Sequence, residues 1–123
     1  MAYLNDRVFD SGLTVLDTES DKITITSQIA GTYAEANATY ALGNTTTVTV
    51  GAPADRSAGG REVTVSAVTD GAVTGTGTAT HYAVLDVTAT RLLAAGSLTA
   101  SQVVTSGNTF TLASFKVGIP DPA

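Results

Sequence analysis

The sequence alternates apolar β-branched residues with threonine over several short runs. In KITIT, Ile23 and Ile25 alternate with threonines, and the runs TTTVTV (45–50) and REVTVSAV (61–68) repeat the pattern with valines. Because side chains two positions apart lie on the same face of a strand, each run predicts a strand with one apolar and one hydroxylated face. This spacing favours β-sheet over helix for most of the chain.

The second half of the sequence is predicted to hold further strands joined by glycine-containing turns or polar connections. The strands are expected at 72–87, 91–96, 102–105 and 109–119. The turns and connections are expected at 69–71, 97–101 and 106–108, where threonine, serine, glycine and asparagine gather. Apolar parity changes near Ala113-Ser114 within the last strand, which predicts a one-residue bulge there.

Two segments do not have the strand pattern. GAPADRSAGG (51–60) is rich in glycine and small residues and is expected to be a surface loop. GTYAEANATYALG (31–43) fits either a short helix, capped by Thr32 with Glu35 completing a capping box, or an irregular loop anchored by its tyrosines. The chain is therefore predicted to be all-β. We expect a single antiparallel β-sandwich over 1–123, jelly-roll-like, with at most one short helix near 31–43.

Charge and composition limit the classes of partner. The chain has six basic and eleven acidic residues, giving a net charge of −5, and the basic residues are scattered, so we expect no nucleic-acid partner. It has no cysteine, no secretory leader and no membrane-length apolar run, so we expect a soluble protein made in a cytosol with no membrane partner. Charged residues make up only 14%, and a sparsely charged, threonine-rich surface suits contact with other protein.

The stretch TGTGTATHYAVLD (75–87) holds the single histidine, His81, beside two closely spaced glycines. A phosphate-binding loop would need a following helix, and the residues that follow are strand-like. A serine triad would need a nucleophile elbow, and no G-x-S-x-G occurs. We interpret His81 as a partly buried strand residue, and Gly75 and Gly77 as positions that either leave room for a large side chain across the sheet or mark a bulge.

An acidic trio in LDTESDK also fails as a metal site. Asp17, Glu19 and Asp21 alternate, but Lys22 and Gln28 stand where a calcium loop requires glycine and a bidentate glutamate. The sequence therefore predicts no catalytic residue, no metal site, no cofactor and no small-molecule substrate.

Residues 79–119 resemble the C-terminal half of small virion proteins of tailed bacteriophages. The similarity is carried by Thr80-His81-Tyr82, Asp86, Leu92-Leu93, Gly96, Leu98, Val103-Val104 and Gly107-Asn108-Thr109. The start, MAYLNDRVFDSGLTVLDTESDKITITSQ, and the centre, YAEANATYALGN, also look like phage and prophage proteins of this size. One departure is Ala83-Val84-Leu85 after Tyr82, where many relatives have Gly-Ile-Trp.

The resemblance implies a non-enzymatic virion structural protein. The leading hypothesis is a capsid decoration (cement) protein on the capsid surface, whose partners are the major capsid protein and copies of itself, with a trimer implied by the family. The alternatives are a tail- or fibre-associated structural or receptor-binding domain and, from another class, a carbohydrate-binding module. Residues 1–12 are a candidate assembly arm. The candidate interface residues, in this arm and around the 54–60 loop, are Tyr3, Leu4, Arg7, Phe9, Arg56 and Arg61.

Overall fold

The structure is a computed structural model that describes residues 5–120. These residues form two compact units, each built from separated stretches of the chain. The described part of the first unit comprises residues 5–19, 49–67 and 113–120, and the second comprises residues 20–48 and 68–112. The chain thus passes between the units four times, and each unit depends on segments that are distant in sequence.

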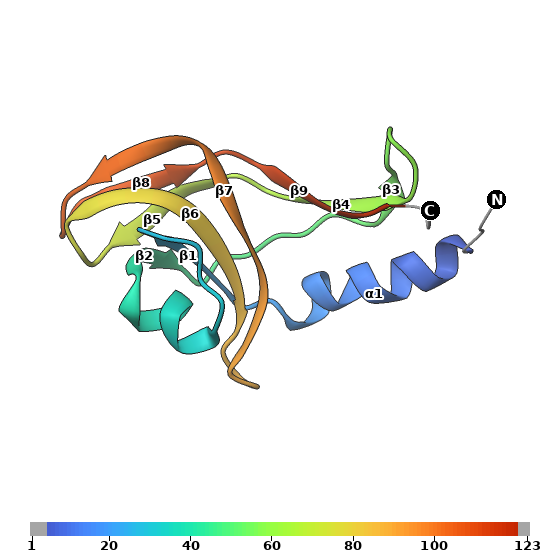
Figure 1. Ribbon diagram of the computed structural model, residues 1–123, viewed down its shortest axis with the longest axis horizontal. Coiled ribbons are helices and arrows are strands. Elements are labelled where there is room, and N and C mark those ends of the chain that lie inside the picture. Colours follow the sequence, from blue (N-terminus) through green and yellow to red (C-terminus); the bar gives the residue numbers. More distant parts are fainter. Residues whose placement is uncertain (1–4, 121–123) are drawn as a thin grey trace. The chain divides into compact units, whose positions relative to one another are not determined.

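The second unit is a six-stranded antiparallel sheet with the strand order β7-β6-β1-β2-β5-β8. Figure 1 shows this sheet as strongly curled, with the long strands β6 and β7 arching side by side. Such a sheet fits the predicted all-β, sandwich-like fold. Its strands are β1 (Lys22–Thr26), β2 (Ala41–Thr45), β5 (Val68–Val73), β6 (Gly77–Asp86), β7 (Arg91–Val104) and β8 (Thr109–Leu112).

Strand β1 is buried on both faces. Ile23 and Ile25 are fully buried, as their apolar pattern predicts, but Thr24 and Thr26 on the opposite face are fully buried as well. The threonine face is covered because a second small core lies on that side of the sheet. This core contains Ala30, Ala36, Ala83 and Leu85, with Tyr33, Tyr40, Leu92 and Ala95 packed against it. Strand β1 thus has the predicted apolar and hydroxylated faces, and residues 23–26 are buried on both.

The segment 31–43 contains the short helix that was one of its two predicted states. It is the π-helix η1 (Glu35–Thr39), which follows two helical residues. The predicted cap is present: the Glu35 amide donates to Thr32 Oγ1 at 3.2 Å, and the Glu35 carboxylate accepts from the Gly31 amide at 2.9 Å. The capping residues therefore fix where the turn begins.

Glycines allow close packing where aromatic and aliphatic side chains cross the sheet. A Cβ added at Gly71 would lie 2.2 Å from the Phe110 ring, and one added at Gly77 would lie 3.3 Å from Leu42. Gly75 also faces Leu42, at 3.5 Å. Gly77 therefore leaves room for a large side chain, Leu42, as one of its two interpretations predicted, whereas a Cβ at Gly75 would make only ordinary contact with Leu42.

The first unit packs one helix on a three-stranded sheet with the order β3-β4-β9. Its elements are α1 (Asp6–Glu19), β3 (Ala54–Asp55), β4 (Arg61–Val65) and β9 (Phe115–Ile119). The helix begins after Asn5, whose side chain accepts the Arg7 amide at 2.9 Å as an N-cap. It buries Phe9, Leu13 and Leu16, which lie on one helical face at spacings of four and three.

This helix is an addition to the predicted elements, since the sequence predicted helix only near 31–43. Residues 5–12 of the predicted arm belong to α1 or its cap, and residues 1–4 lie outside the described part of the chain.

Several predicted strand boundaries also need correction. TTTVTV is not a strand: β2 ends at Thr45, and Val50 makes only an isolated bridge to Val65. Residues 69–71 are not a turn, because β5 continues through them. Residues 97–101 do not separate two strands, since β7 is continuous, although its pairing with β6 shifts there. The predicted bulge at 113–114 is instead a break between β8 and β9, which pair in different sheets.

Thr24 and Thr26 provide a matched test of buried hydroxyl groups. Thr26 Oγ1 donates to the Gln28 carbonyl at 2.7 Å, whereas Thr24 Oγ1 is the buried side-chain oxygen without a partner among the described residues. We expect Thr24→Val to stabilise the protein by about 1 kcal/mol, because it removes an unsatisfied hydroxyl without changing shape. Thr26→Val should destabilise it by about 1–2 kcal/mol, because it leaves a carbonyl unpaired. Urea unfolding measures both, and equal effects of the two substitutions would contradict the structure.

Candidate interaction surfaces

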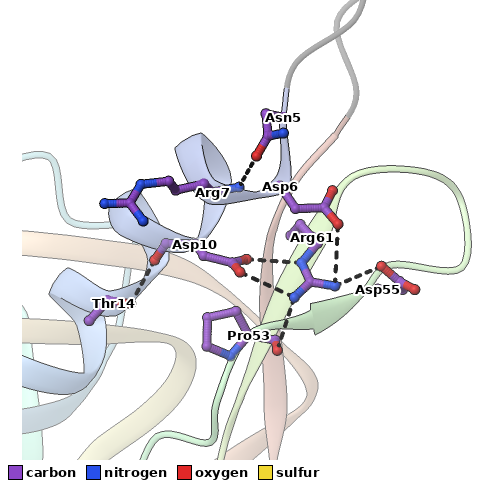
Figure 2. A network of polar contacts seen from close by, with 8 residues as sticks. All are labelled: Asn5, Asp6, Arg7, Asp10, Thr14, Pro53, Asp55 and Arg61. Carbon is purple, nitrogen blue, oxygen red and sulfur yellow. Dashed lines mark hydrogen bonds and ion pairs between the residues drawn. The ribbon is translucent and has the colours of Figure 1, made fainter.

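Arg61 at the start of β4 joins three segments of the first unit (Figure 2). Its guanidinium binds the Asp10 carboxylate of α1 through two hydrogen bonds of 2.9 and 3.2 Å. It also binds Asp55 of β3 at 2.7 Å and the Pro53 carbonyl at 3.4 Å, and Asp6 lies 3.9 Å away. The hydrogen bonds to Asp10 and then Asp55 raise the pKa of Arg61 above its ordinary value. The arginine therefore ties the helix to the loop that precedes β4.

The structure brings the two predicted interface segments together at this arginine, but not as a free surface. Arg61 itself is only 17% exposed, and Phe9 is 1% exposed in the core under the helix, so neither offers its side chain to a partner. Arg7 is exposed, and Figure 2 shows its side chain pointing away from Arg61. Arg56 is half-buried and donates to the Gly59 carbonyl at 3.0 Å. Tyr3 and Leu4 lie outside the described residues.

His81 is held within the sheet, in agreement with its interpretation as a strand residue. It is half-buried in β6, opposite Thr26 of β1 and Ser97 of β7. Its Nδ1 lies 2.8 Å from Thr80 Oγ1, which in turn donates to the Ser27 carbonyl at 2.9 Å. Through Thr80, these contacts orient the imidazole ring of His81 and hold the backbone at Ser27. Their role is structural.

Glu35 and Tyr40 form a coupled pair in the second unit, in which each side chain shifts the pKa of the other. The Gly31 amide and then the Tyr40 hydroxyl donate to the Glu35 carboxylate and lower the pKa of Glu35. The same hydrogen bond, with the negative charge of Glu35, raises the pKa of Tyr40. Burial raises the pKa of Tyr82. The hydrogen bond between Glu35 and Tyr40 links the first residue of η1, Glu35, to the residue that follows its last, Tyr40.

The surface of the second unit carries very little charge. Its charged side chains are Asp21, Lys22, Glu35, Asp70, Asp86 and Arg91. Several of them serve the fold: Asp21 accepts the Val87 amide at 2.7 Å, and Lys22 donates to Asn37 at 2.8 Å. Most of what remains exposed is hydroxylated, including Thr69, Thr74, Thr76, Thr78, Thr99, Ser101, Thr105, Thr109 and Thr111. Val103 is an apolar residue on this surface. It lies opposite Thr78 and is 84% exposed.

The two edge strands of the six-stranded sheet, β7 and β8, both depart from a regular, open hydrogen-bonding ladder. Along β7 the register against β6 shifts between Val84 and Leu85 and again between Ala79 and His81. At the far edge, the Thr111 carbonyl of β8 accepts from Gln102 Nε2 of β7 at 2.5 Å, so the curled sheet brings its two edges together at one end. Bulges and covered carbonyls interrupt the regular ladder that another strand would need.

No cluster of three or more potential metal ligands occurs in residues 5–120. An open hollow on α1, of about 570 Å³, is lined by Arg7, Asp10, Ser11 and Thr14. Within the same range, no helix is both long and apolar enough to cross a membrane.

Comparisons with protein-family models, with curated proteins and with solved structures give no match.

The two carboxylates that bind Arg61 should differ in their effect on stability. Asp10 binds through both oxygens and is 34% exposed, whereas Asp55 binds through one and is 88% exposed. We expect Asp10→Asn to lower the urea midpoint clearly more than Asp55→Asn, because exposed ion pairs contribute little. Arg61→Lys should behave more like Asp10→Asn, since lysine keeps the charge but cannot form the two-pronged contact. Equal midpoints for the two aspartate variants would contradict this geometry.

The Glu35–Tyr40 pair predicts how pH affects η1. The lowered pKa of Glu35 means that its contribution to stability is present above its ordinary value of 4.5 and is lost as pH falls through the folded pKa. The raised pKa of Tyr40 means that its contribution is present below 10.0 and is lost as pH rises through the folded pKa. In an ultraviolet titration of phenolate, Glu35→Gln should lower the pKa of Tyr40 but not that of Tyr82. Tyr40→Phe is the control that identifies the signal, and an unchanged titration in Glu35→Gln would refute the pairing.

Proposed function

We propose that the chain is a non-enzymatic structural protein of a tailed-bacteriophage particle, and that it binds the outside of the capsid as a decoration protein. The observation that carries the proposal is the nearly uncharged, hydroxylated surface of the six-stranded unit. The resemblance of residues 79–119 to phage virion proteins gives this surface its setting.

Physical chemistry connects such a surface to assembly. Burying lysine or glutamate at an interface costs desolvation and about 1.5–2 kcal/mol of side-chain entropy, whereas threonine, serine and alanine lose less. Charged residues are accordingly depleted in the centres of protein interfaces. A small domain present in many copies adds weak contacts through multivalency, so each contact can be modest. The proposed partners are the major capsid protein and further copies of this chain.

The bulged and closed edges of the six-stranded sheet also fit this proposal. A protein that accumulates at high local concentration on a particle must avoid pairing its strands indiscriminately with those of its neighbours. The shifts along β7 and the Gln102–Thr111 hydrogen bond interrupt the edges where such pairing would begin. The contacts proposed here therefore involve side chains on the sheet surface.

Copy number in purified phage particles tests the proposal directly. Quantitative mass spectrometry should find the chain in hundreds of copies per particle if it decorates the head. A handful of copies per particle would indicate a tail or fibre protein instead. Absence from the particles would overturn both the head and the tail assignment.

A charge placed in the neutral surface should prevent binding. We expect Val103→Asp to reduce the amount bound to undecorated capsids at least tenfold, because an unpaired carboxylate would be buried at the contact. Val103→Thr, which keeps the surface neutral, is the matched control and should bind like the parent. Binding should also persist in 0.5 M salt, because few charges take part. Normal binding of a folded Val103→Asp protein would exclude this part of the surface from the contact.

A further inference from the structure

The outer edge of β9 is a regular strand edge with which no strand of the described residues pairs. In the three-stranded sheet, β9 lies at one side and pairs only with β4. Its register against β4 is uninterrupted from Phe115 to Ile119. The other edges differ, since β7 is bulged, β8 has an occupied carbonyl and β3 has two residues. Of the edges described, β9 is the one best suited to accept another strand.

Hydrogen bonds on the far side of β4 show which groups of β9 face outward. The Gly51 amide donates to the Thr64 carbonyl, and the Ser66 amide donates to the Thr49 carbonyl. The backbone groups of Thr64 and Ser66 therefore point away from β9, and alternation along β4 directs those of residues 61, 63 and 65 toward it. Their partners are residues 119, 117 and 115. The amides and carbonyls of Lys116 and Gly118 consequently point to the open edge.

Two cationic side chains lie on the face of the sheet that carries Lys116 and Gly118. Lys116 is 66% exposed, with its Nζ 3.0 Å from Glu62 Oε2, and Glu62 is almost buried. The Arg56 side chain lies directly over Gly118, since a Cβ added there would be 2.9 Å from Arg56 Cδ. Among residues 5–120, two cations and one anion gather at this spot and make it positive, although the net charge of the chain is −5. An incoming strand therefore meets positive charge on this face.

The positive charge argues against a second copy of β9 as the occupant. In an antiparallel pair centred on Val117, Lys116 of one chain would lie opposite Gly118 of the other, beneath the second chain's Arg56. Centring the pair on Lys116 or on Gly118 brings like residues together, with the same repulsion. Cationic side chains on a strand edge are a recognised device against such self-pairing. An acidic side chain at these positions would instead be attracted.

The opposite face of β9 offers an apolar row. Phe115, Val117 and Ile119 lie on the face that also carries Val63 and Val65, and all three remain half-buried at the edge. Apolar side chains on an added strand would extend this row and cover it further. The edge therefore favours a segment that is apolar on one face and acidic on the other.

We propose that β9 is a strand-addition site that binds an extended segment of another protein, in which apolar residues alternate with acidic ones. Backbone hydrogen bonds to Lys116 and Gly118 hold the segment, and Lys116 and Arg56 select its acidic residues. The inference goes beyond the proposed function, because it names a different surface and does not depend on the protein being part of a virion.

Hydrogen exchange with a model peptide tests the site on the whole chain. In the free protein, the amides of Lys116 and Gly118 should exchange much faster than that of Val117. An acetylated Thr-Val-Glu-Val-Asp-Val-Thr amide, at saturation, should slow exchange at Lys116 and Gly118 at least tenfold. The matched peptide with lysine in place of both acidic residues should bind at least fivefold more weakly.

Variants separate the backbone contact from the charge. Lys116→Pro removes an outward-facing amide, so the protein should fold normally but lose peptide binding. Val117→Pro removes an amide that donates to β4 and should destabilise the first unit. This result checks that residues 115, 117 and 119 face β4 while residues 116 and 118 face the open edge. Lys116→Gln and Arg56→Gln keep the backbone groups and should each weaken the Kd about two- to fivefold.

Three results would overturn the proposal. The first is protection of the Lys116 and Gly118 amides before peptide is added. The second is equal binding of the acidic and basic peptides. The third is undiminished binding by a folded Lys116→Pro protein.

Discussion

Strand β1 is the constraint on which the six-stranded unit depends. It is hydrogen-bonded to β6 on one side and β2 on the other, and its residues 23–26 are fully buried on both faces. Ile23 and Ile25 fill one core, while Thr24 and Thr26 contact the second, smaller core under η1. A strand with neighbours on all four sides fixes the register of the others, because a slip of one residue would exchange isoleucines for threonines.

Several of the few charged groups of this unit organise its turns. Asp86 is buried and accepts the Ala89 amide at 3.1 Å in the β6–β7 turn. Asp21 reaches the same turn through the Val87 amide and, at 3.4 Å, the Thr88 hydroxyl. The turn ends at Thr90, whose φ of 52° is unusual for a β-branched residue. These carboxylates hold a strained hairpin in place and are engaged within the chain.

Local signals in the sequence predicted the features that local chemistry controls. The alternation in KITIT predicted β1, and the predicted Ser106-Gly107-Asn108 turn is present. Thr32 and Glu35 form the cap that was expected if segment 31–43 were helical, the other alternative being an irregular loop. Gly77 was also interpreted as a packing position or a bulge, although its packing partner, Leu42, could not be named. Each of these predictions depends on residues close together in the chain.

Features that depend on distant pairing were not predicted. The helix α1 shows its apolar residues at helical spacing, but Gly12 and several β-branched residues give it weak intrinsic propensity, so packing against β4 and β9 stabilises it. The parity change at Ala113-Ser114 was visible, yet whether it means a bulge or a change of sheet depends on which strand lies opposite. The burial of Phe9 and the ion pairs of Arg61 likewise follow from that tertiary arrangement.

The place of β9 in the chain also has a consequence for biosynthesis. The helix α1 and the strand β4 emerge from the ribosome well before β9, which follows the last strand of the six-stranded sheet. With translation at about 5–20 residues per second, α1 precedes β9 by roughly 5–20 seconds. During that interval β9 is missing from the sheet on which Phe9, Leu13 and Leu16 of α1 pack. The nascent first unit therefore closes after the six-stranded unit has all its strands.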